Sequence, residues 1–156
     1  MEAYLKIRPL KSSFPLNVQL ELREKAIKEV ERVFLPSREI EKVILIGSSV
    51  KGTFGQYEAP GFRGSLFSDF DFIFIVTDNY RIPEWLNREP DGKPFPIESL
   101  NLAYRNKKLI DDKYDCEFFF VRKSSLKIKD FQDLAERAGI PMREGSSINH
   151  LVIYQE

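Results

Sequence analysis

The segment SDFDFIFIV, residues 68–76, decides most about this chain. Its Phe and Ile content favours a β-strand, because these residues fit a pleated surface. Side chains two residues apart project from the same face of a strand, so Asp69 and Asp71 share one face and the phenylalanines take the other. Neighbouring carboxylates repel each other, so the pair requires a divalent cation, an arginine or open solvent. Of these, the sharpest interpretation is Mg²⁺ or Mn²⁺, which bind hard oxygen ligands.

A second short strand precedes this segment. Residues 43–46, VILI, form a continuous apolar run that is typical of a strand buried on both faces, and Gly47-Ser48 follow directly. Glycine lets a backbone approach phosphate groups closely, and the Ser48 hydroxyl is a donor. The end of this strand is therefore a candidate phosphate-binding site.

A further pair of carboxylates lies in YDCEF, residues 114–118. Asp115 and Glu117 again share one face of a predicted strand, whereas Cys116 faces away from them. The cysteine is therefore expected to be an inert core thiol. A two-metal phosphoryl-transfer site needs a carboxylate beyond the first pair, and both Asp115 and Glu117 remain candidates for it.

The remaining pattern predicts a single α/β (α+β) domain over residues 1–156, with a small mixed sheet flanked by helices. Helices are expected at 16–34, 97–110 and 129–138, and strands at 43–46, 68–76, 114–121 and 149–154. A glycine-rich loop is expected at 47–68. A proline-rich excursion is expected at 78–96, with no core residue except an anchoring Trp85.

Composition excludes several classes of protein. The 24 Lys and Arg balance the 24 Asp and Glu, so no chain-wide field favours nucleic acid or an anionic membrane. No apolar run reaches the length of a membrane span. With one cysteine and no apolar leader at the N-terminus, we expect a cytoplasmic protein.

Gly47-Ser48 after an apolar strand, Lys51-Gly52 just beyond, and Asp69-Phe70-Asp71 on the next strand together resemble the signature of the DNA polymerase beta-type nucleotidyltransferase superfamily. The small single-domain members are the most similar. The resemblance covers residues 40–78 and, more loosely, 113–156. It implies the nucleotidyltransferase fold and Mg²⁺-dependent transfer of a nucleoside monophosphate from an NTP to an acceptor hydroxyl on a protein, a small molecule or an RNA end.

The resemblance also implies roles for individual residues. Nucleotide binding falls on Gly47, Ser48, Ser49 and Lys51. Metal binding and catalysis fall on Asp69, Asp71 and one of Asp115 or Glu117. A protein partner or a second copy of the chain is expected to complete the acceptor site, and a toxin–antitoxin partner is one candidate.

Two loops depart from the family pattern, since residues 53–67 are longer than usual and 78–96 have no obvious counterpart. We expect both to border the nucleotide site and to select the acceptor or partner, with little contribution to the core. The competing hypothesis is a catalytically degenerate module that keeps the fold and binds a nucleotide or a protein. A nucleic-acid-binding domain is disfavoured, because no basic run with interleaved aromatic residues is present.

Overall fold

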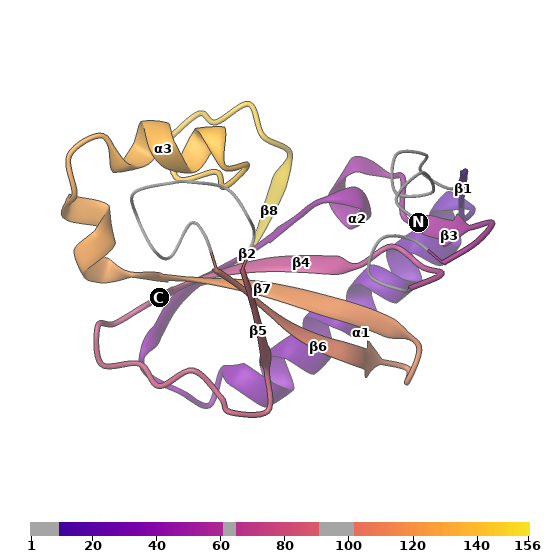
Figure 1. The fold of residues 1–156 in the computed structure, drawn as a ribbon, viewed down its shortest axis with the longest axis horizontal. Helices are drawn as coiled ribbons and strands as arrows, with labels where there is room; N and C mark the ends of the chain where they lie inside the picture. Colours follow the sequence, from indigo (N-terminus) through magenta and orange to yellow (C-terminus); the bar gives the residue numbers. More distant parts are fainter. Residues whose placement is uncertain (1–9, 61–64, 91–101) are drawn as a thin grey trace.

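A computed structural model describes residues 10–60, 65–90 and 102–156, which form a mixed α+β fold (Figure 1). Its helices are α1 (Leu16–Phe34), α2 (Ser48–Lys51), the short 3-10 helix η3 (Lys123–Lys127) and α3 (Phe131–Arg137). Its strands are β1 (Lys11–Ser13), β2 (Ile40–Ile46), β3 (Gly55–Tyr57), β4 (Phe70–Val76), β5 (Asn87–Pro90), β6 (Leu102–Ile110), β7 (Tyr114–Arg122) and β8 (His150–Gln155).

The long helix α1 has the bounds that the sequence predicts. It begins directly after Pro15 and buries a stripe formed by Leu22, Ala26 and Val30, which recur at helical spacing. Its opposite side is charged. Because a helix with one apolar stripe must cover another apolar surface, α1 packs against the sheet.

The main sheet has six strands in the order β5-β6-β7-β4-β2-β8. Neighbouring strands are antiparallel except β4 and β7, which are parallel, so the sheet is mixed as predicted. In this order the register aligns one residue from each of four strands: Ile46, Asp71, Glu117 and Arg105. The end of β2 thus lies beside the acidic start of β4.

The two faces of the sheet bury different clusters. Phe72 and Phe118 belong to the larger core beneath α1, together with the buried stripe of that helix. Ile73, the next residue along β4, belongs to a smaller cluster with Phe131 and Ala135 of α3. Since successive strand residues point to opposite faces, α1 and α3 cover opposite faces of the sheet.

The helix predicted at 97–110 is wrong over its described part. Residues 102–110 form β6, which pairs with β7 on one side and β5 on the other; 97–101 lie outside the described residues. Ala103 and Tyr104 suit either a helical stripe or an alternating strand. Pairing with the apolar strand β7 decides between the two patterns, because tertiary contacts override local preference.

The two long loops contribute more to the core than the sequence predicts. Phe54 is 1% exposed and lies before β3, which pairs with β1. In the excursion after β4, Tyr80 and Leu86 are buried, whereas Trp85 is 46% exposed and packs one side on Phe34. Residues 61–64 and 91–96 of these loops lie outside the described residues.

The C-terminal part follows the prediction with shifted bounds. The helix expected at 129–138 is α3, shorter by a few residues and preceded by η3, and the last strand is β8. Among the described residues, no helix is long and apolar enough to cross a membrane.

Candidate functional site

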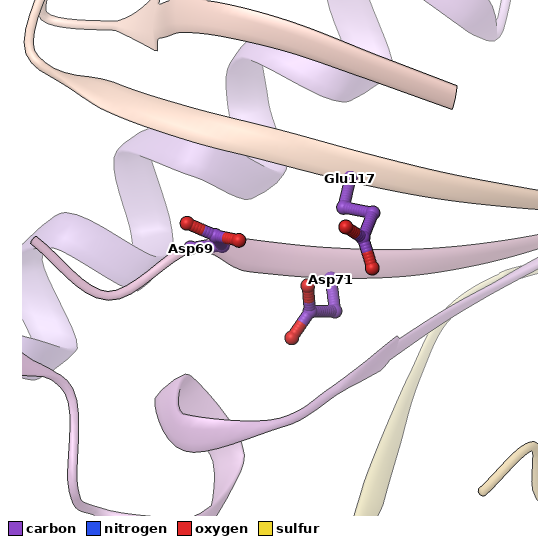
Figure 2. A group of neighbouring side chains, drawn as sticks. All are labelled: Asp69, Asp71 and Glu117. Atoms are coloured by element: carbon purple, nitrogen blue, oxygen red, sulfur yellow. The ribbon is translucent and has the colours of Figure 1, made fainter. Parts of the chain in front are cut away.

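Three carboxylates meet on the α3 face of the sheet, at the end of β2. Asp69 immediately precedes β4, Asp71 lies in β4 and Glu117 lies beside Asp71 in the parallel register of β4 and β7. One oxygen of each lies within 4.8 Å of the others, and all three residues are partly exposed. Figure 2 shows Glu117 reaching from β7 toward Asp71 in β4 and Asp69 just before it.

This donor set suits a hard divalent cation. Mg²⁺ takes oxygen ligands and keeps several positions for water or substrate phosphate, so three carboxylates at the edge of a face satisfy its chemistry. Of the four predicted carboxylates, the structure thus groups Asp69, Asp71 and Glu117.

The fourth carboxylate, Asp115, is held differently. It is 5% exposed, and one of its oxygens accepts a hydrogen bond from the backbone N–H of Lys108 at 2.9 Å. Its other oxygen accepts one from Nη1 of Arg105 at 3.2 Å. Asp115 therefore supports the β6–β7 hairpin and the arginine beside the carboxylate group.

Sequence reasoning missed Arg105. Its side chain is 1% exposed, and Nη2 donates to Asp69 at 2.7 Å and to Glu117 at 2.8 Å. The aspartate pair did signal the need for a cation or an arginine, but these partners lie 36 and 12 residues away in the chain. The helix expected over this segment hid the strand position that brings Arg105 to Glu117.

Gly47 lies directly against Asp71. Its φ of 85° and ψ of −158° belong to a region that only glycine adopts readily. A Cβ at this position would lie 2.4 Å from Oδ2 of Asp71. The backbone after β2 thus reaches the carboxylates only because residue 47 has no side chain.

The other residues predicted to bind nucleotide lie at different depths. Ser48 begins α2 and is partly exposed next to Gly47. Ser49 is buried, and its hydroxyl has no hydrogen-bond partner among the described residues. Lys51 is exposed at the end of α2, and its charge contributes to lowering the pKa of Lys11 after the larger effect of burial.

Cys116 lies on the face away from the carboxylates, as the alternation predicts, in the core beneath α1. Burial raises the pKa of its thiol well above the usual value, and the negative charges of Asp71, Asp69 and Asp115 raise it further. The thiol therefore stays protonated at neutral pH and is a core residue.

A cavity of about 440 Å³ opens beside Asp115, between residues 65–67 and the β6–β7 hairpin. Its lining includes the ammonium-bearing side chains of Lys107, Lys108 and Lys113, together with Phe67. The Lys113 ammonium lies 4.9 Å from the centre of the Phe67 ring. Asp112 and Asp115 also line it, so the cavity combines three ammonium groups with two carboxylates.

Neither protein-family models nor curated proteins give a match to this chain.

Proposed function

We propose that this chain is a Mg²⁺-dependent nucleotidyltransferase with the fold of the DNA polymerase beta-type superfamily. It transfers a nucleoside monophosphate from an NTP to an acceptor hydroxyl, and pyrophosphate leaves. The observation that carries the proposal is the meeting of Asp69, Asp71 and Glu117 within 4.8 Å, beside the backbone of Gly47.

In this proposal Asp69, Asp71 and Glu117 hold the metal. A bound divalent cation neutralises phosphate charge and activates the phosphorus toward attack. The three side chains come from two adjacent sheet strands or their immediate start, so their positions are fixed by backbone pairing. Rigid placement suits phosphoryl transfer, in which positioning and charge compensation supply most of the rate enhancement.

The triphosphate lies at Gly47 and Ser48. The missing side chain at Gly47 lets phosphate oxygens reach the backbone beside Asp71, and the Ser48 hydroxyl donates to them. Lys51, exposed at the end of α2, supplies a positive charge near the same strand end.

The acceptor approaches from the side of β6 and β7. Its oxygen forms a bond to the α-phosphorus while the bond to the pyrophosphate oxygen breaks, and its proton passes to a carboxylate. Glu117 is the third carboxylate in this role, since both oxygens of Asp115 are engaged by Arg105 and Lys108. The lysine-lined cavity beside Asp115 suits an anionic part of the acceptor or of a partner protein.

One observation favours the alternative of a catalytically degenerate binding module. Arg105 already neutralises part of the acidic group, as a structural ion-pair network would. In such a module the same face binds a nucleotide or a protein without turnover.

The test is incubation of the purified chain with each α-labelled NTP and Mg²⁺ or Mn²⁺, with pyrophosphate release and label transfer as readouts. The doubly substituted Asp69→Asn, Asp71→Asn protein must lose both signals. Glu24→Gln, an exposed carboxylate on α1, is the matched control and must keep them. Metal-dependent nucleotide binding without release or transfer in the wild type would favour the module.

A further inference from the structure

The hairpin formed by β6 and β7 contains a bulge next to Asp115. The register of the two strands shifts between Asn106 and Ile110, where residues 107–109 of β6 lie opposite Asp115 of β7. Lys108 adopts the left-handed conformation, with a φ of 60°, and its backbone N–H donates to Oδ1 of Asp115 at 2.9 Å. A residue with a side chain is disfavoured in this conformation, so the buried carboxylate holds a bulge that is unfavourable by itself.

The bulge brings two consecutive lysines to one cavity. Successive residues of a regular strand point to opposite faces, yet Lys107 and Lys108 both line the cavity between the hairpin and residues 65–67. Bulges re-aim side chains in this way and are frequent beside active sites. Lys113, just before β7, lines the same cavity, and its ammonium lies 4.9 Å from the centre of the Phe67 ring. Three ammonium groups therefore gather at one small cavity.

The carboxylates beside these ammonium groups do not form ion pairs with them. Asp115 accepts a hydrogen bond from Nη1 of Arg105 in addition to the one from the bulge, so both of its oxygens are engaged. In the described part of the chain, Asp112 lines the cavity without an ion pair to a lysine, and the neighbouring Asp111 pairs with Lys25 at 3.2 Å. Ammonium groups held close together repel each other, and a bound anion relieves that repulsion.

The size and position of the cavity indicate which anion suits it. Its volume of about 440 Å³ is typical of small-molecule sites, and Leu66 and Phe67 add apolar lining. Asp115 lies two residues before Glu117 on the same face of β7, a separation of about 7 Å at the usual rise of a strand. An anionic group held by the lysines thus lies within the length of a small molecule from the carboxylates of the candidate site.

We propose that this cavity is a phosphate-binding site, in which Lys107, Lys108 and Lys113 hold the phosphate of a small phosphorylated molecule. The site itself stands on the cavity and its lysines, whereas its place in the reaction rests on the proposed function. In that reaction the cavity holds a phosphate of the acceptor, and the acceptor hydroxyl reaches the carboxylates beside Gly47. The substrate class is then a phosphorylated polyol or sugar with a free hydroxyl several bonds from its phosphate.

The first experiment measures binding without metal or nucleotide. Inorganic phosphate, sorbitol 6-phosphate and unphosphorylated sorbitol are titrated into the full chain in metal-free buffer, with calorimetry and amide NMR shifts as readouts. Both phosphates are expected to bind saturably and to shift the amides of residues 65–67 and 107–113. Sorbitol is expected not to bind, because the lysines recognise the phosphate.

Variants of the lysines test the geometry. The double variant Lys107→Gln, Lys113→Gln is expected to bind phosphate about tenfold more weakly, because it loses two charged donors. The matched control Lys28→Gln, Lys129→Gln removes two exposed lysines that do not line the cavity, and it should bind as the wild type does. Lys108→Gly relieves the left-handed conformation, so its melting temperature should hold or rise while phosphate binding weakens. This variant keeps the test decisive should the first double variant fail to fold.

A second experiment identifies the source of the phosphate. With labelled NTP and Mg²⁺, sorbitol 6-phosphate is expected to raise label transfer above the level reached with sorbitol, and Lys107→Gln, Lys113→Gln should remove that difference. Inhibition of pyrophosphate release by sorbitol 6-phosphate, with competition between NTP and inorganic phosphate, supports the site and assigns it to phosphates of the nucleotide. Binding without any effect on turnover overturns the place of the cavity in the reaction.

The outcomes separate this inference from the proposed function. A lack of saturable phosphate binding, or equal binding in the wild type and in Lys107→Gln, Lys113→Gln, overturns the inference, and NTP turnover by the same protein leaves the proposed function intact. Phosphate binding that depends on the lysines, in a chain that neither releases pyrophosphate nor transfers label, supports the site and overturns the proposed function.

Discussion

The two faces of β4 and β7 differ sharply although they belong to the same strands. On the α1 face, Phe72 and Phe118 are register partners whose rings stack with centroids 5.7 Å apart. On the other face, the adjacent register partners are Asp71 and Glu117. Successive residues of each strand therefore belong to the apolar core on one face and to a group of carboxylates on the other.

The acidic face is itself divided along its length. Ile73 lies two residues beyond Asp71 and packs with Phe131 of α3. Along β4 and β7, both fully described, the carboxylates of this face gather at the end beside Gly47. The apolar part packs against α3, whereas the three carboxylates at the other end are partly exposed.

The largest effect is expected from removing one aromatic ring from the core beneath α1. Phe72→Ala removes a fully buried ring from the centre of the larger core, and such truncations lower the free energy of unfolding by about 3–5 kcal/mol. Denaturant unfolding measures the loss. A change below about 1 kcal/mol would show that this face does not hold the fold together.

The neighbouring residue on the other face should behave in the opposite way. Under the proposed function, Asp71→Asn removes a metal ligand and relieves repulsion from Asp69 and Glu117. Nucleotidyl transfer should then fall about 100-fold or more while the melting temperature holds or rises. Pyrophosphate release and a thermal melt decide this together. Full activity in the variant would show that Asp71 is not a metal ligand.

A substitution at Gly47, beside Asp71, tests whether the carboxylates depend on the close approach of the backbone. Gly47→Ala forces a residue into a glycine-only backbone region and places Cβ against Asp71, which should cost about 1–3 kcal/mol and displace the carboxylate. Gly52→Ala is the matched control, because its φ of 81° is also positive but its Cβ would meet nothing within 4 Å. Metal binding should weaken in the first variant alone, and equal weakening in both would contradict the role of the Asp71 contact.

The smallest effect is expected from deprotonating Tyr80, a buried residue of the larger core, at alkaline pH. Burial, and then the charge of Glu39, raises the pKa of Tyr80 to about 12. The unfolded chain has a tyrosine pKa of about 10, so the neutral form contributes stability below pH 10 that is lost as the pH rises toward 12. Tyr80→Phe should make this alkaline loss shallower by on the order of 1 kcal/mol, measured by unfolding at pH 9 and pH 11.5. An unchanged slope would show that Tyr80 does not titrate in this window.

Local pattern predicts the elements whose burial follows one period. Helical spacing fixes α1, and the alternation of β4 places Asp69 and Asp71 on one face. The same alternation separates Cys116 from Glu117. For these segments the periodicity of apolar residues is sufficient to predict the type of element and the direction of its side chains, because each buries one continuous face.

Long-range pairing decides the rest. Residues 102–110 contain apolar positions compatible with both periods, and only their pairing with β7 makes them a strand. The position of Arg105 depends on that pairing, as does the different environment of Asp115 and Glu117. The sequence identifies the carboxylates and the need for a cation, whereas the sheet order identifies which cation it is.

The most direct test of the account measures melting temperatures with Mg²⁺ alone, each NTP alone, and both together, in the wild type and in Asp71→Asn. If metal and triphosphate complete each other's ligand sets beside Gly47, the two together stabilise the wild type more than the sum of their separate effects. At about 100 times the dissociation constant the gain is about 2.7 kcal/mol, and Asp71→Asn should lose it. The absence of a joint effect with all four NTPs at saturating Mg²⁺, or an equal effect in Asp71→Asn, would contradict a nucleotide site on this face.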